Sequence, residues 1–327
     1  MRRAVLQKGK AWLEDCPDPT PQGEWVVVRV RVSPICGSDR KAFLSDQPVR
    51  TAGHEGTGQV AAVAGSSRVR EGDRVVINPL SGCGRCRECR TGNYIYCRNK
   101  PAWETHFAEY VRVQDFVLSP LPDDISFRRG ALAGCALAPA FNAQKRMAVG
   151  PADALLVTGL GPVGLGAVVV GKFRGARVIG VDVEPYRREL AMRLGADAAL
   201  DAGDARIREL VAEAAAPGGP TKALDASGSP VAQRLCLDAL GPGGMAAWVG
   251  QNREPIPVNP SLDFINKGLT LLGAWHYNLN DWDEMAELLR RSPVAEEIIT
   301  HEYPLASVQE AFDVFVSGKA GKVFLLV

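Results

Sequence analysis

A glycine-rich turn in the middle of the chain constrains the fold more than any other feature of the sequence. The apolar run Ala154 to Thr158 predicts a strand, and Gly159-Leu160-Gly161-Pro162-Val163-Gly164 follows it at once and opens a helical segment. In this strand–turn–helix context, G-x-G-x-x-G indicates a dinucleotide site. Gly159 permits the tight turn, Gly161 lets the backbone approach a pyrophosphate, and Gly164 permits close packing of helix on strand. The helix N-terminus then offers free N–H groups to the phosphates.

A carboxylate ends the next expected strand, and its charge affects the choice between NAD and NADP. Val178-Ile179-Gly180-Val181-Asp182 closes with the acid at the position that binds both hydroxyls of an adenosine ribose. A 2′-phosphate there would meet like charge, so Asp182 favours NAD over NADP. Arg187 and Arg188 lie close by in the sequence and would soften that preference. The alternative interpretation is an ordinary strand–helix turn followed by a surface aspartate.

The pattern of the chain changes near Asp153, which predicts two kinds of domain. Before it the sequence is β-rich, and Val26, Val28 and Val30 mark one face of a strand. After it, strands and helices alternate, which indicates a parallel, doubly wound sheet. We predict an α/β protein with a β-rich domain 1–135, a doubly wound domain 136–275 and a return segment 276–327. Strands are expected at 24–32, 59–64, 73–77, near 107–110, and at 154–158, 177–183, 222–226, 245–250, 269–275 and 322–327. Helices are expected after the glycine turn and at 187–194, 231–240, 282–291 and 308–317.

Four closely spaced cysteines predict a closed metal site in the β-rich part, with the spacing C-x2-C-x2-C-x7-C: Cys83, Cys86, Cys89 and Cys97. A tetrahedral four-thiolate site is typical of structural zinc. An iron–sulfur cluster is the competing interpretation, but the ferredoxin motif places its fourth cysteine three residues later, followed by proline. Here seven residues intervene and Arg98 follows. We therefore predict structural zinc in a lobe spanning residues 82–98.

Three further ligand types stand outside that lobe: Cys36 in Cys36-Gly37-Ser38-Asp39, His54 in Gly53-His54-Glu55, and Cys135 after Gly134. A Cys/His/Cys set leaves one coordination position open for water or substrate, as in a catalytic zinc site. Taken singly, each of these residues would more often be an ordinary core side chain. Together, and in a chain that also carries a dinucleotide motif, they predict a second zinc ion.

With both zinc motifs and the glycine turn in place, the chain resembles the zinc-dependent alcohol dehydrogenases of the medium-chain dehydrogenase/reductase family. The resemblance covers essentially the whole length and includes the ending Pro304-Leu305…Glu310-Ala311-Phe312…Gly321-Lys322-Val323. It implies a GroES-like catalytic domain, a Rossmann domain that binds NAD, and two zinc ions per chain. It also implies that Cys36, His54 and Cys135 bind the catalytic zinc; many polyol dehydrogenases of the family have a glutamate as third ligand, where this chain has Cys135.

The resemblance assigns roles to four residues near the ligands. Asp39 is similar to the carboxylate that orients the histidine ligand, and Glu55 to the glutamate behind the metal, a transient ligand. Ser38 takes the position of the residue that accepts the alcohol proton. Many relatives end the proton relay with histidine where this chain has Lys41. A lysine titrates near pH 10.4 unless it is desolvated, so we expect Lys41 to contact the cofactor, with water as the alternative exit for the proton.

Composition limits the partners of the chain. A net charge of +1 over 327 residues argues against a nucleic-acid, membrane or polyanion partner. The apolar stretch 154–171 is interrupted by glycines and a proline, and the first residues do not read as a signal peptide. Eight cysteines with metal-like spacings fit a reducing compartment, so we expect a cytoplasmic protein in which Cys16 and Cys236 are buried, inert thiols. The resemblance implies a homodimer or homotetramer.

The substrate is the least constrained part of the prediction. Trp103, Glu104, His106, Asn142 and the run Trp275-His276-Tyr277-Asn278 add polar and aromatic groups near the expected site. Such groups favour a secondary alcohol rich in hydroxyls, such as a polyol, sugar or cyclitol. An NAD(P)H-dependent carbonyl reductase and a catalytically silent zinc and nucleotide binder are the alternatives.

Overall fold

The computed structural model describes residues 1–327 except Ser66, Trp103 and Ala216. It divides into two compact units, which are described separately. Unit 1 comprises Met1–Cys135 and Asn278–Val327, and unit 2 comprises Ala136–Tyr277. None of the helices in the described part of the chain is long and apolar enough to cross a membrane.

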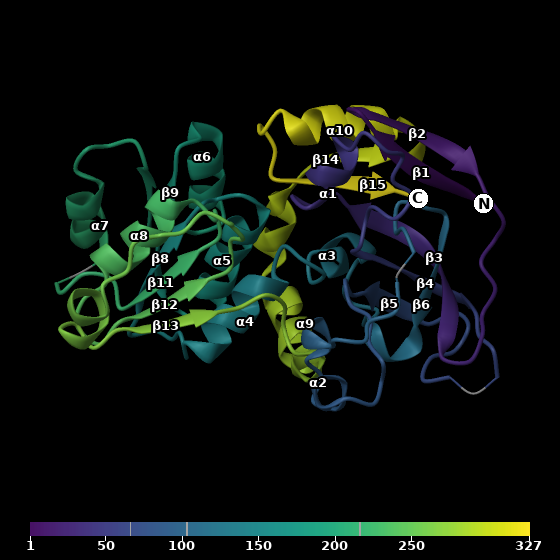
Figure 1. Ribbon diagram of the computed structural model, residues 1–327, viewed down its shortest axis with the longest axis horizontal. Helices are drawn as coiled ribbons and strands as arrows, with labels where there is room; N and C mark the ends of the chain where they lie inside the picture. Colours follow the sequence, from purple (N-terminus) through teal and green to yellow (C-terminus); the bar gives the residue numbers. More distant parts are fainter. Residues whose placement is uncertain (66, 103, 216) are drawn as a thin grey trace. The chain divides into compact units, whose positions relative to one another are not determined.

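Unit 1 is built on a mixed sheet with the strand order β14-β15-β3-β4-β5-β7, to which β6 is added through β3 (Figure 1). A separate antiparallel hairpin pairs β1 with β2. Val26, Val28 and Val30 are fully buried in one core cluster, as their alternation predicts. The strands are β1 (Arg2–Gln7), β2 (Lys10–Asp15), β3 (Trp25–Pro34), β4 (Gly56–Ala62), β5 (Arg74–Ile77), β6 (Tyr110–Gln114), β7 (Leu118–Pro120), β14 (Ile299–Pro304) and β15 (Lys322–Leu326); the α-helices are α1 (Asp39–Phe43), α2 (Arg87–Arg90), α3 (Phe127–Ala131), α9 (Trp282–Arg291) and α10 (Val308–Val316).

Strand pairing in unit 1 brings distant segments together at one place. β3 and β4 are antiparallel neighbours with Val32 opposite Thr57, so the segment that follows β3 lies beside the segment that precedes β4. β15, near the C-terminus, pairs with β3 from the other side, and the Ile35 N–H donates to the Val323 carbonyl at 2.9 Å. These pairings fix the segment that leads into Cys36, one of the expected metal ligands.

Unit 2 is a parallel sheet with the strand order β10-β9-β8-β11-β12-β13 (Figure 1). Numbered within the unit, this order is 3-2-1-4-5-6, the order of the doubly wound dinucleotide-binding fold. Ligands of such sheets bind at the carboxyl ends of the strands where the order reverses, which here is between β8 and β11. The strands are β8 (Ala154–Thr158), β9 (Arg177–Asp182), β10 (Ala198–Asp201), β11 (Lys222–Asp225), β12 (Met245–Trp248) and β13 (Thr270–Gly273); the α-helices are α4 (Ala138–Arg146), α5 (Pro162–Phe173), α6 (Pro185–Arg193), α7 (Ile207–Ala215) and α8 (Pro230–Ala239).

The predicted fold class is confirmed, and each predicted strand and helix is present within a few residues of its expected bounds. The strand expected near 107–110 begins only at Tyr110, as β6. The expectations omitted β10, α4 and α7 of unit 2, and β1, β2, β7, β14, α1, α2 and α3 of unit 1. Cys236 is fully buried as expected. The expectation for Cys16 was wrong, since this residue is only half-buried, with its thiol 3.6 Å from the Met1 carbonyl.

Candidate functional site

The glycine turn of unit 2 connects β8 to α5 and uses its three glycines in different ways. Gly159 has φ +81°, a conformation that favours glycine, and a Cβ there would lie 2.5 Å from the Ser227 side chain. A Cβ on Gly164 would overlap the carbonyl oxygen of Gly159. A Cβ on Gly161 would meet nothing within 4 Å. Two of the glycines are therefore required by the fold itself, whereas Gly161 borders open space at the start of α5.

Asp182 ends β9 beside this turn and is 6% exposed. Its carboxylate accepts hydrogen bonds from the Leu160 N–H at 2.6 Å and from the Glu184 N–H at 2.9 Å. An ionised carboxylate has about four acceptor positions, so two remain for a ligand. Arg187 lies 4.0 Å from the carboxylate, and Arg188 donates to the Asp182 backbone carbonyl at 2.9 Å. The glycine turn and Asp182 thus lie together at the carboxyl ends of β8 and β9, where a dinucleotide is expected.

In unit 1, the structure brings together Cys36, His54, Glu55 and Cys135, one ligand atom of each lying within 4.8 Å of all the others. The Cys36 and Cys135 sulfurs are 3.5 Å apart. Tetrahedral zinc with Zn–S bonds of about 2.3 Å would separate two sulfur ligands by about 3.8 Å. The donor set and its spacing therefore fit a zinc ion.

Asp39 holds together the loop that carries Cys36 and the loop that carries His54. It is 4% exposed, and its carboxylate accepts hydrogen bonds from the Cys36 N–H at 2.9 Å and the Gly53 N–H at 3.0 Å. It also lies 3.6 Å from Nδ1 of His54. Burial would lower the pKa of His54, but Asp39 and Cys36 outweigh burial and raise it well above its ordinary value. A carboxylate on one nitrogen of a ligating imidazole fixes its tautomer and orientation.

The sulfur atoms of this group interact strongly. A hydrogen bond with Cys135, together with the positive charges of Lys322 and His54, lowers the pKa of Cys36 well below that of an ordinary thiol. The same sulfur contact raises the pKa of Cys135. A favoured thiolate beside a second sulfur is the chemistry that a divalent metal stabilises, because the thiolate is the form that binds metal.

Lys322 belongs to this site and was missed as a site residue from the sequence. Its Nζ lies 2.6 Å from Oε1 of Glu55, and the two side chains are 1% and 0% exposed. Burial works against the charge of Lys322, but Glu55 and the cysteines outweigh it and raise its pKa. Burial also raises the pKa of Glu55 to about 7, although Lys322 opposes that rise. The only signal for Lys322 in the sequence was its place in the Gly321-Lys322-Val323 ending.

Ser38 and Lys41 are both exposed beside the ligand loop. Ser38 directly precedes α1, and Lys41 lies within that helix. Ser38 stands two residues after Cys36, so its position is compatible with the proton-accepting role, and that role stays a prediction. The cofactor contact of Lys41 also stays a prediction.

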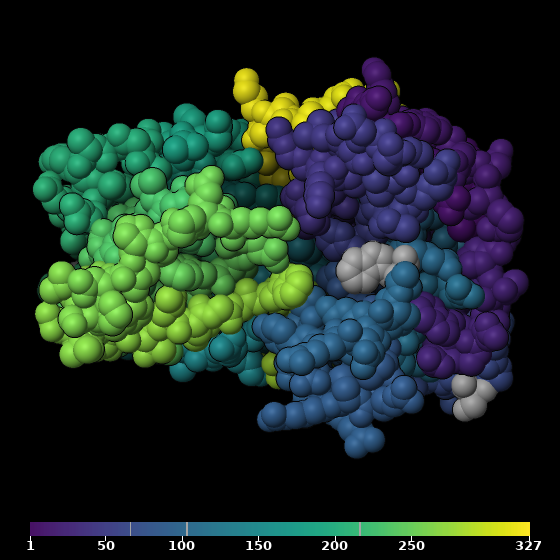
Figure 2. Space-filling view, in the orientation of Figure 1, coloured from purple at the N-terminus to yellow at the C-terminus, as the bar shows by residue number. Residues whose placement is uncertain are grey.

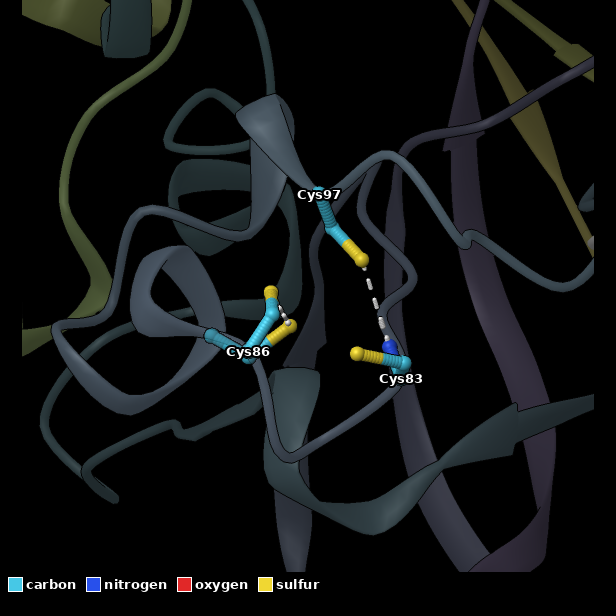
Figure 3. A group of neighbouring side chains, drawn as sticks. Cys83, Cys86 and Cys97 are labelled. Atoms are coloured by element: carbon cyan, nitrogen blue, oxygen red, sulfur yellow. Dashed lines mark hydrogen bonds between the residues drawn. The ribbon is translucent and has the colours of Figure 1, made fainter.

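The four cysteines of the lobe form the second metal-binding group, with all four sulfurs within 4.8 Å of one another. The Cys83 N–H donates to the Cys97 sulfur at 3.4 Å, and the Cys86 and Cys89 sulfurs are 3.5 Å apart. Figure 3 shows Cys83, Cys86 and Cys97 arranged around a common space. Backbone N–H groups of Arg85 and Cys86 lower the pKa of Cys83 to about 6, which favours its thiolate. The lobe, residues 82–98, lies at the surface of unit 1, in blue in Figure 2.

Three of the polar residues expected near the substrate have partners within the protein, and their contact with substrate stays a prediction. Glu104 pairs with Arg112 at 3.1 Å, Asn142 donates to the His276 carbonyl at 2.6 Å, and Asn278 donates to the Thr91 carbonyl at 2.7 Å. Tyr277 packs edge-on against Phe141. Trp103 lies outside the described residues.

His106 differs from this group. It is 2% exposed, and its Nδ1 is buried without a hydrogen-bond partner in the part of the chain that the structure describes. Burial and the neighbouring His54 lower its pKa to about 3.

Comparison with known proteins agrees with this geometry. Residues 22–123 match the alcohol dehydrogenase GroES-like domain, and residues 162–291 match the zinc-binding dehydrogenase family. The chain is 32% identical over 335 residues to an uncharacterized zinc-type alcohol dehydrogenase-like protein of Escherichia coli, covering 96% of this chain and 94% of that protein. It belongs to the zinc-dependent alcohol dehydrogenases of the medium-chain dehydrogenase/reductase family. Zinc and NAD are therefore the cofactors of this alcohol dehydrogenase, and two zinc ions per chain are typical of its family.

Two further relatives extend the comparison. The L-threonine 3-dehydrogenase of Alteromonas mediterranea is 32% identical over 337 residues, covering 99% of this chain and 98% of that protein. The solved structure of alcohol dehydrogenase TADH from Thermus sp. ATN1 has a TM-score of 0.92 at 29% identity, with both chains fully covered. The alcohol dehydrogenase described here thus matches these relatives over nearly all of their length.

Proposed function

We propose that this enzyme transfers hydride between NAD and a secondary alcohol that carries a second polar group on the neighbouring carbon. The observation that carries the proposal is the gathering of Cys36, His54, Glu55 and Cys135 in one group. In this proposal Cys36, His54 and Cys135 bind zinc, and the fourth position is left to the substrate. A bound zinc ion would act there as a Lewis acid on the substrate oxygen. Ser38 accepts the proton of the alcohol, and Asp39 keeps His54 oriented as a ligand.

The cofactor is assigned to unit 2. In this proposal the N–H groups at the start of α5 bind the pyrophosphate beside Gly161, and Asp182 binds the adenosine ribose through the acceptor positions that its two backbone contacts leave free. Lys41 contacts the cofactor, and water carries the proton away. A carbonyl reductase working toward the alcohol is the second candidate, since the same groups serve both directions.

The substrate class rests on chemistry and on one relative. A polyol, sugar or cyclitol fits the class, and so does threonine, a secondary alcohol with an amino group on the next carbon, on which the Alteromonas relative acts by its name. Glu104, Asn142 and Asn278 have partners within the protein. The proposal therefore rests on what these candidate substrates share, one polar group on the carbon next to the reacting one.

A matched substrate panel tests this proposal. Purified enzyme with NAD is given 2-butanol and 2,3-butanediol, which differ by one hydroxyl, and then L-threonine, sorbitol and myo-inositol, with NADH absorbance as the signal. We expect a kcat/KM at least 10-fold higher for the diol, or for threonine, than for 2-butanol. Equal values for all would contradict the neighbouring-group requirement, and turnover only of ketones with NADPH would favour the reductase.

We also propose a cytoplasmic homo-oligomer, either a dimer or a tetramer. The described cysteines form no disulfide, and unit 2 exposes apolar side chains such as Leu262 and Ile265, at 62% and 74% exposure. Sedimentation that gives a 35.0 kDa monomer at micromolar concentration would contradict the oligomer.

A further inference from the structure

Lys322 is an unusual residue to find beside a metal-binding group. It is the first residue of β15, lies 267 positions from Glu55 in the sequence, and is 1% exposed. A buried ammonium is costly unless an opposite charge compensates it. The Glu55 carboxylate, at 2.6 Å, provides that charge.

The location of Lys322 is set by the fold. The Ile35 N–H donates to the Val323 carbonyl, so the residue after Lys322 is fixed to the residue before Cys36. Glu55 directly follows His54 in the sequence. The ion pair therefore connects the segment that carries His54 to β15, which is itself bonded to the segment that carries Cys36. β15 contributes no metal ligand of its own.

Glu55 presents one oxygen to Lys322 and leaves the other without a partner. Oε2 is buried and has no hydrogen bond to any described residue. One carboxylate oxygen of Glu55 also lies within 4.8 Å of the Cys36, His54 and Cys135 ligand atoms. Because carboxylate oxygen is a common zinc ligand and Glu55 already lies within this group, Glu55 is a potential fourth ligand. A site with four protein ligands is closed and has no position for substrate.

We propose that Lys322 is a positioning residue that holds the Glu55 carboxylate off the metal and so keeps the fourth coordination position open. Two thiolates would balance the charge of Zn²⁺, which leaves the carboxylates of Asp39 and Glu55. Asp39 accepts hydrogen bonds from backbone N–H groups, whereas the Glu55 charge has Lys322 as its partner. Lys322 balances it at a fixed place. This inference rests on the proposed zinc site, and it concerns the state of that site before substrate arrives.

Three variants separate this role from simple packing. In Lys322→Met the carboxylate loses its partner, and the metal becomes the nearest cation, so we expect Glu55 to bind it and the KM for the alcohol to rise at least 10-fold. Lys322→Met combined with Glu55→Gln removes the competing ligand, so its KM should be at least 3-fold lower than that of Lys322→Met. Lys322→Arg keeps the charge and should stay close to the parent.

The decisive measurement is the visible spectrum of the cobalt-substituted enzyme without substrate, since Co²⁺ absorption reports the number and type of ligands. We expect the spectrum of Lys322→Met to differ from the parent and that of the double variant to return to it. Equal impairment of both variants in KM and spectrum would overturn the proposal, because it would mean that Lys322 only packs.

Glu55→Gln alone provides a test that does not depend on the folding of Lys322→Met. If Lys322 holds Glu55 off the metal in the parent, this variant should leave the resting cobalt spectrum unchanged. A changed spectrum would show that Glu55 already binds the metal, and would overturn the proposal. A parent protein that binds cobalt but oxidises no alcohol would defeat the proposed function and leave this spectral test valid.

Discussion

The glycine turn offers a matched pair of substitutions in which the same added methyl group should have opposite consequences. In Gly164→Ala, the new Cβ would overlap the Gly159 carbonyl oxygen, a backbone atom that cannot rotate away. In Gly161→Ala, the new Cβ has no neighbour within 4 Å, and the Gly161 conformation, φ −68° and ψ −175°, is one that alanine adopts readily. The first change should damage the fold, and the second should damage cofactor binding.

The magnitudes follow from these contacts. Overpacking of a rigid interior costs about 1–3 kcal/mol, and a backbone clash belongs at the upper end of that range. For a unit of this size, each kcal/mol lowers Tm by roughly 2–4 °C, so Gly164→Ala should lower it by about 5–10 °C. Gly161→Ala should leave Tm within about 2 °C of the parent. Loss of one or two charged hydrogen bonds to the pyrophosphate corresponds to a rise in the Kd for NADH of roughly 10–100-fold.

Thermal unfolding of the apo protein and calorimetric titration with NADH measure the two effects separately. Gly150→Ala is a control, because its Cβ also meets nothing within 4 Å and it lies outside the turn. The reasoning is refuted if Gly161→Ala binds NADH as tightly as the parent and the control. It is equally refuted if Gly164→Ala unfolds at the parent temperature.

The remaining predictions concern the metals and the two charged cofactor contacts. Cys89→Ser removes a buried ligand of the closed site, so we expect one zinc per chain and a marked fall in Tm. Cys36→Ser should also leave one zinc per chain, but it should keep the parent Tm and lose turnover. Elemental analysis that finds two zinc ions in either variant would contradict these assignments. Asp182→Ser should narrow the preference for NAD over NADP by roughly 10–100-fold, since it removes both the ribose acceptors and the repulsion of a 2′-phosphate; an unchanged kcat/KM ratio for the two cofactors would sink this assignment. Lys41→Ala should raise the KM for NAD and leave the pH–rate profile in place, whereas a shifted acidic limb with unaltered cofactor affinity would make Lys41 a proton relay.

The parts of the fold that the sequence predicted well carry their own local signals. β8 and α9 have the predicted bounds because a fully apolar run marks the first and a strongly amphipathic pattern marks the second. β10 gave no such signal, since Ala198, Ala199 and Leu200 are only half-buried at the edge of the sheet. β6 and β14 are short and exist because of pairing with β3 and β15, partners far away in the sequence. Such pairings are decided by tertiary structure, which overrides local propensity.

The candidate site also contains residues that the sequence predicts and residues that it does not. Cysteine spacing and the glycine motif are read from the sequence because chemistry dictates those residue types at those intervals. Lys322 could not be found in this way, because a lysine at the start of a strand is ordinarily exposed. The Glu55 carboxylate that compensates its buried charge lies 267 positions away in the sequence. For Asn142 and Glu104, polarity alone does not separate a substrate contact from a structural one. Their polarity suggested substrate, and the structure shows hydrogen bonds that hold the protein's own chain.

The two metal-binding groups both use cysteine sulfur, but their surroundings differ. In the lobe, four sulfurs meet one another, and the lowered pKa of Cys83 comes first from backbone N–H groups, which cannot move or compete for the metal. In the other group, charged side chains surround the ligands: Asp39 beside His54, and Glu55 with Lys322 behind. A carboxylate near an open metal position is a potential competitor for substrate. The Lys322–Glu55 pair is therefore the feature we expect to separate a site that reacts from one that only holds the fold together.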